Sequence, residues 1–150
     1  MIYNRTQSDV DQAEYIIKNL KNANELTAEQ IEILERGTLT INTINRIEDK
    51  QAELKSRLNE IGYWNTDIVN KTWTYYDFFH QADFDRLQSN TTTLRNAFFT
   101  FKNTPEISNN NYIKYQTIND IEKILFDIEQ MIEIVKNAFR ECGTFECGEE

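Results

Sequence analysis

The chain of 150 residues is short of the two residues that interrupt regular structure, with four glycines and one proline. Because glycine and proline mark turns and end helices, this shortage favours a few long elements over a fold with many turns. Hydrophobic residues make up 39% and charged residues 27% of the chain, close to the globular average, which argues against wholesale disorder. At this length we expect one domain with a buried core.

Long hydrophobic runs are also missing. No stretch approaches the roughly 18 apolar residues that a membrane-spanning helix needs, and the N-terminus has no apolar segment of signal-peptide length. We therefore expect a protein made and kept in a cytosol, with no membrane partner.

The 16 basic residues are outnumbered by 25 acidic ones, which gives a net charge of −9. Such a surface repels phosphate, so no nucleic-acid partner is expected.

Cysteine and histidine, which supply most zinc ligands and many nucleophile–base pairs, are scarce. Cys142, Cys147 and the single His80 cannot complete a four-ligand zinc site. The two cysteines could close a small disulfide loop, whereas a cytosolic origin favours free thiols. No Gly-rich phosphate loop, nucleophile motif or HExxH sequence is present. We therefore expect no cofactor, no metal and no catalytic residue.

One cluster could still carry chemistry. Asp77, His80 and Asp83 follow at three-residue steps, with Asp85 nearby, so on a helix they lie on neighbouring faces. They could converge on a metal or form an acid–base group. The alternative is a helix start at which the acids cap the first turn and interact with its dipole. Because no second histidine supports a metal centre, the capping interpretation is favoured.

Apolar residues recur at helical spacing in five segments. Two segments open with a capping-box sequence, at Thr6–Asp9 and Thr27–Gln30. Residues 38–43 alternate Thr with Leu and Ile and could form a strand, but they are better read as the lead-in to a helix. The predicted helices cover about 7–22, about 28 to a C′ glycine at Gly37, a third helix ending at Gly62, about 82–101 and about 117–140.

The third predicted helix has a charged face and the fourth a polar centre. In the third, six charged residues are read as a solvated surface with pairs at i,i+4. They are Glu48, Asp49, Lys50, Glu53, Lys55 and Arg57. In the fourth, residues 90–93 (Asn-Thr-Thr-Thr) are poor helix formers and weaken its centre. The fold expected is mostly α: a bundle of four to five helices over residues 1–141, then a tail segment over 142–150. A small extended or β element is expected near Trp64–Tyr76 or at the C-terminus.

Both tryptophans lie in an aromatic block that is the least helical part of the chain. Trp64, Trp73, Tyr75 and Tyr76 are separated by Asn, Thr and Asp, so they could form an exposed protein interface. Alternatively they seal the core where the connection crosses the bundle, which is favoured because large aromatic residues are usually buried. The tail could add a strand to a neighbour's sheet edge. The candidate interface residues are Trp64, Trp73, Tyr75, Tyr76, Phe145, Cys147 and Gly148.

Several short motifs occur in a fixed order along nearly the whole chain. They are the opening Asn4–Asp11, Ile44–Glu48, Leu58–Tyr63, Lys71–Thr74, Leu94-Arg95 with Thr104-Pro105, Asn119–Leu125 and the final Cys-Gly-Glu. Together these motifs resemble a family of small proteins and domains encoded in tail modules of bacteriophages and prophages of gut and related Gram-positive bacteria. The ending departs from the family's pattern, with Cys where Ser or Tyr is expected.

The resemblance implies a structural role in the virion and transfers no catalytic residue. The expected function is a tail, baseplate or fibre-associated adaptor that is made in the host bacterial cytoplasm. Its expected partners are other tail or baseplate proteins and further copies of itself. An alternative is an acidic, phage-encoded cytosolic regulator or inhibitor that occupies a basic site on a host protein. A third is an enzyme centred on Asp77, His80 and Asp83.

Overall fold

The computed structural model describes residues 1–20, 25–64, 66–107 and 112–142, the last four by their backbone alone. Five helices form in these ranges, which confirms the mostly helical bundle. They are α1 (Gln7–Asn19), α2 (Ala28–Gly37), α3 (Ile41–Glu60), α4 (Gln81–Ala97) and α5 (Tyr115–Cys142). No strand occurs within the described ranges, and the segment near Trp64–Tyr76 is an irregular connection. The predicted tail, from residue 143 on, lies outside them.

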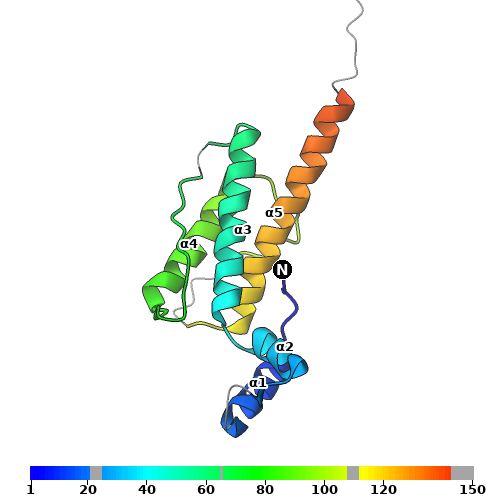
Figure 1. Ribbon diagram of the computed structural model, residues 1–150. Coiled ribbons are helices and arrows are strands. Elements are labelled where there is room, and N and C mark those ends of the chain that lie inside the picture. Colours follow the sequence, from blue (N-terminus) through cyan, green and yellow to red (C-terminus); the bar gives the residue numbers. More distant parts are fainter. Residues whose placement is uncertain (21–24, 65, 108–111, 143–150) are drawn as a thin grey trace, which may run out of the picture.

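Helices α3, α4 and α5 each pack on the other two and form the bundle, while α1 and α2 pair as a hairpin at one end of it (Figure 1). The far end of α5 projects past the bundle at the opposite end (Figure 1). The core is mostly aliphatic, with a few aromatic members, and comes mainly from the three bundle helices. Its fully buried members include Ile47, Leu54, Leu58, Phe84, Leu87, Leu94, Ile121, Ile124, Leu125, Ile128 and Ile132.

Three helix starts follow from side-chain capping. Both predicted capping boxes form. The side chains of Thr6 and Thr27 each accept from the backbone N–H three residues later, at Asp9 and Gln30. The side chains of Asp9 and Gln30 accept in return from the backbone N–H of the threonine. Thr40 Oγ1 accepts from the backbone N–H of Thr43, so residues 38–40 are the lead-in to α3 and not a strand. These bonds satisfy donors that the first helical turn leaves unpaired. Two helices end earlier than predicted, α1 at Asn19 and α4 at Ala97.

Gly62 ends α3 as its position predicted. Its φ of +92° is the left-handed conformation that glycine adopts without steric cost. The N–H of Gly62 donates to the carbonyl of Asn59 at 3.1 Å, and the N–H of Tyr63 donates to that of Leu58 at 2.9 Å. These two bonds form a Schellman motif. The motif turns the chain sharply, so that Tyr63 packs against the core.

Gly37 has a different role from the one its sequence position suggested. It is the last residue of α2, within the helix, and not a left-handed C′ residue. A Cβ atom there would lie 2.2 Å from the carbonyl oxygen of Asp9 and 2.4 Å from the Cβ of Ala13. Glycine is therefore required because the backbones of α1 and α2 approach closely at this point. Arg36 closes the same contact with an ion pair to Asp9 at 3.0 Å.

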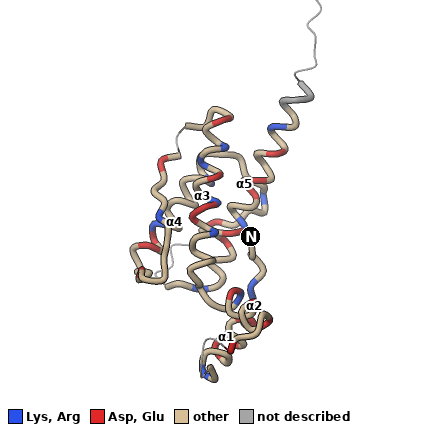
Figure 2. Tube along the Cα trace, viewed as in Figure 1, with Lys and Arg blue, Asp and Glu red and all other residues tan. Residues whose placement is uncertain are grey.

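A buried carboxylate on α5 fastens the N-terminal segment to the bundle. Glu122 accepts from the backbone N–H of Ile2 at 3.2 Å and pairs with Arg5 and with Arg46 of α3. Asn119 exchanges two bonds with the backbone of Arg5, at 3.2 and 2.9 Å. Since Arg5 directly precedes the cap of α1, these contacts hold the base of the hairpin. Both signs of charge occur along α3 and along α5 (Figure 2).

Replacing Gly37 by alanine should force α1 and α2 apart. Overpacking of this kind costs about 1–3 kcal/mol in the free energy of unfolding, and we expect the hairpin to become sensitive to limited proteolysis. The matched variant is Gly62→Ala, whose added Cβ would meet nothing within 4 Å. This variant should lower the free energy of unfolding by about 1–2 kcal/mol, because of the left-handed φ alone. The hairpin should stay protected from the protease. Equal protection of the hairpin in both variants would contradict the close-approach explanation.

Acid should weaken the hairpin through Asp9. The hydrogen bond from Arg36 lowers the pKa of Asp9 from 3.8 to about 2, helped by the bonds from Thr6. The folded-state pKa lies below the unfolded one, so the contribution is complete above about pH 5 and is lost as the pH falls toward 2. We expect Asp9→Asn to remove about 1–2 kcal/mol at pH 7 and little at pH 2. Thermal unfolding of both proteins across this range measures the difference, and a constant difference would refute it.

Candidate functional site

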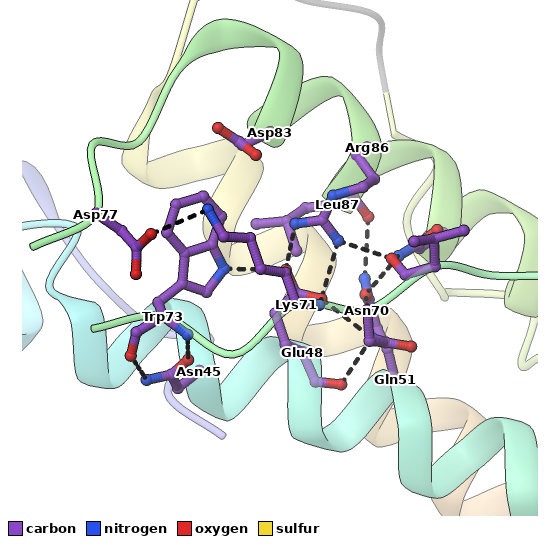
Figure 3. A network of polar contacts seen from close by, with 12 residues as sticks. Asn45, Glu48, Gln51, Asn70, Lys71, Trp73, Asp77, Asp83, Arg86 and Leu87 are labelled. Atoms are coloured by element: carbon purple, nitrogen blue, oxygen red, sulfur yellow. Dashed lines mark hydrogen bonds and ion pairs between the residues drawn. The ribbon is translucent and has the colours of Figure 1, made fainter.

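Residues 70–73, in the connection between α3 and α4, are held on the bundle by one buried carboxylate (Figure 3). Glu48 of α3 is only 1% exposed. It forms an ion pair with Arg86 of α4 and accepts from Trp73 Nε1 at 3.1 Å. The backbone N–H of Lys71 and the side-chain amide of Asn70 also donate to it, at 3.2 and 3.1 Å. One charge on α3 therefore fixes both α4 and the connection.

Two side-chain amides complete this network. Asn45 pairs with the backbone of Trp73 in both directions, accepting from its N–H at 2.8 Å and donating to its carbonyl at 2.9 Å. Gln51, which is fully buried, donates to Leu87 O at 3.0 Å and to Thr91 Oγ1 at 2.9 Å. It accepts in turn from Asn90 at 3.1 Å. The polar centre of α4, predicted to be a weakness, thus supplies partners to α3.

The prediction that Glu48 belongs to a solvated face is wrong. Glu48 and Gln51 follow Ile44 and Ile47 at the spacing i, i+3, i+4 and i+7, which places all four on one helix face. That face is buried, so the position and not the residue type decided burial. Of the other five charged residues of the predicted solvated face, Asp49 and Glu53 are exposed. Lys50 and Arg57 pair with Glu129 of α5, at 2.9 and 3.4 Å, and Lys55 donates to the carbonyl of Ile68 at 3.2 Å.

Trp73 lies in the core and is not available to a partner. Its side chain is 4% exposed, its ring centroid lies 5.2 Å from that of Phe79, and Lys71 Nζ lies 3.7 Å above the ring. As a candidate interface residue Trp73 was therefore misassigned, and the core-sealing alternative holds for this tryptophan.

The neighbouring aromatic residues are exposed. Tyr75 is 86%, Tyr76 94% and Phe78 81% accessible. The two tyrosines form the tip of a turn that Asp77 closes by accepting from the N–H and the hydroxyl of Thr74, both at 2.8 Å. These bonds lower the pKa of Asp77. We call residues 74–78 the aromatic turn. The aromatic turn directly follows the buried Trp73, so a segment that is anchored to the bundle holds these exposed side chains.

The candidate interface residues that the structure describes do not form one surface. Trp64 is exposed, but it follows α3 and lies beside the C-terminal end of α4, near Thr93 and Ala97. Tyr75 and Tyr76 precede the other end of the same helix. Phe145, Cys147 and Gly148 lie outside the described residues. Phe78, which sequence reasoning did not select, joins the two tyrosines on the aromatic turn.

The Asp77–His80–Asp83 cluster performs capping. Asp77 closes the aromatic turn, Asp83 accepts from the N–H of His80 at 3.0 Å, and Asp85 accepts from the side chain of Gln81 at 2.8 Å. His80 is exposed at the position before α4. Within the described ranges, no three His, Cys, Asp or Glu side chains gather closely enough to hold a metal ion.

Comparison with protein-family models, curated proteins and solved structures gave no match. A search of the described helices for one long and apolar enough to cross a membrane found none.

Replacing Glu48 by glutamine should destabilise the bundle more than any surface charge change. The variant keeps the shape but leaves Arg86 without its carboxylate, and breaking a largely buried pair costs about 3–5 kcal/mol. Glu53→Gln is the matched control, since its side chain is largely exposed and we expect a change within about 0.5 kcal/mol. Urea denaturation measures both. In a double-mutant cycle with Arg86→Gln, a coupling energy near zero would contradict the role given to this pair.

Proposed function

We propose that this protein is a non-catalytic structural adaptor of a bacteriophage virion, located at the tail, baseplate or a fibre attachment, and that it docks a neighbouring virion protein through the aromatic turn. The virion setting rests on the resemblance of the motifs along the chain. The docking role rests on one observation: an anchored segment exposes three large aromatic side chains, Tyr75, Tyr76 and Phe78.

Physical chemistry supports docking at such a turn. Tyrosine and other aromatic residues carry much of the binding energy of protein interfaces, because they bury a large area with few rotatable bonds. Anchoring lowers the ordering entropy lost on association, and here Asp77, Asn45 and Glu48 hold the segment before any partner arrives. Aromatic side chains that neither fill the core nor support the bundle are available for a partner.

A second candidate is an acidic regulator that occupies a basic site on a host protein. Its support is the net charge of −9, with 25 acidic against 16 basic residues. Such binding would weaken steeply with salt, since charges drive it. Docking through the aromatic turn would depend far less on salt, because apolar burial drives it.

Mass spectrometry of purified phage particles from the source culture is the first test. We expect peptides of this chain in fixed ratio to the major tail proteins. Abundance in the infected-cell lysate together with absence from clean particles would refute the virion role and favour the regulator.

The docking role has its own test. We expect the double variant Tyr75→Ser/Tyr76→Ser to fold normally, because both side chains are exposed, but to be incorporated at least about tenfold less, as for the loss of an interface hot spot. Tyr15→Ser is the matched control, an exposed tyrosine on α1 far from the turn in sequence. Equal incorporation of all three proteins would exclude the aromatic turn as the docking surface.

A further inference from the structure

A cleft of about 470 Å³ opens between the N-terminal segment, the α1–α2 hairpin and the start of α5. Three cations line it, Arg5, Arg36 and Lys114, together with an apolar wall that includes Val10, Leu39 and Ile113. None of the described residues that line it is Asp or Glu. The described lining therefore carries charged side chains of one sign only, although Arg5 and Arg36 are each paired with an acid outside it, in a chain of net charge −9. We call it the basic cleft.

The cations differ in what they offer a ligand. Arg5 is buried against Glu122, so its charge is already balanced within the bundle. Arg36 pairs with Asp9 but keeps about 30% of its side chain accessible, and Lys114 is exposed. An incoming carboxylate therefore meets Lys114 and Arg36, while the apolar wall accepts a large apolar side chain. The chemistry fits an acidic peptide that carries an aromatic residue.

We infer that the basic cleft binds the segment Phe145–Glu150 of a second copy of this chain. That segment, Phe-Glu-Cys-Gly-Glu-Glu, carries three carboxylates and no cation. Phe145 matches the apolar wall, and Glu149 and Glu150 match Lys114 and Arg36 in charge. The pairing is complementary in the sense that steers protein association and fixes its register.

The length of α5 excludes binding of the segment by its own chain. The cleft lies at the first turn of α5, where Ile118 lines it, and α5 continues to Cys142. At 1.5 Å per residue these two positions are about 36 Å apart. The eight residues from 143 to 150 span at most about 29 Å when fully extended. The segment therefore cannot return to the cleft at the opposite end of its own helix, and a neighbouring copy must supply the cleft.

Such a contact is heterologous, because the donor surface and the acceptor surface are different. Copies joined in this way form a closed ring if the rotation between them closes, or a filament if it does not. The described lining of the basic cleft includes no residue of the aromatic turn, so self-association goes beyond the adaptor role proposed above and does not require it. Loss of one function leaves the other measurable.

Complementation between two full-length variants tests the inference. The cleft variant is Lys114→Glu, and the tail variant combines Phe145→Ser with Glu149→Gln and Glu150→Gln. In sedimentation velocity under reducing conditions, we expect the wild-type protein to self-associate with rising concentration and less so with rising salt. Each variant alone should associate at least about tenfold more weakly. An equimolar mixture should give a 1:1 heterodimer that grows no further, since only one intact cleft meets one intact tail.

Lys102→Glu is the matched control: it makes the same charge change at an exposed lysine outside the cleft, and it should leave self-association unchanged. Circular dichroism checks that the variants keep the helical fold. A wild-type protein that stays monomeric at all concentrations would overturn the inference. So would variants that still associate, or a mixture that forms no heterodimer. The Tyr75→Ser/Tyr76→Ser variant should self-associate normally, which separates this result from failure of the docking proposal.

Discussion

The bundle depends on carboxylates buried inside it. A charge taken out of water is tolerated only when cations and hydrogen-bond donors surround it. Glu48 on α3 and Glu122 on α5 meet that condition by collecting donors from distant parts of the sequence: Arg86 and the connection for the first, Arg5 and Arg46 for the second. Each carboxylate thus fixes an irregular segment to a helix. Apolar contacts alone are not directional, so they would allow the segment to shift along the helix.

This arrangement explains how the molecule combines a firm interior with features that project from it. The segment that Glu48 holds carries the aromatic turn, and the segment that Glu122 holds leads into the hairpin beside the basic cleft. Each proposed contact surface therefore adjoins a segment that a buried ion pair holds in place. The fold therefore sets the positions of these two surfaces relative to the bundle, which the proposed docking and self-association both require.

Much of the helical framework could be predicted from local sequence signals. Thr6 and Thr27 predict two helix starts, and Gly62 predicts one helix end. The apolar stripe of α5 predicts which face of that helix is buried. These predictions succeed because each signal acts over four or five residues. The two wrong predictions have different causes. For Glu48 the charge suggested a solvated position, but its place on the apolar face of α3, a local signal, decides its burial. For Gly37 the cause is non-local, since this residue serves a contact with another helix. Nothing in the local sequence marks Trp73 as buried and Tyr75 as exposed. The partners that hold Trp73 in the core, Asn45 and Glu48, lie on α3, more than 20 residues away in the sequence.

The pairing of Asn45 with Trp73 has a consequence for solubility. A non-helical segment that runs along the outside of a bundle presents backbone donors and acceptors, and such groups can recruit a strand from another chain and start aggregation. At Trp73 the Asn45 amide occupies the N–H and the carbonyl together, as a neighbouring strand would. The side chain of Asn45 thereby prevents another chain from pairing as a strand with the backbone of Trp73. The protein can therefore expose aromatic residues next to this position without presenting a free strand edge there.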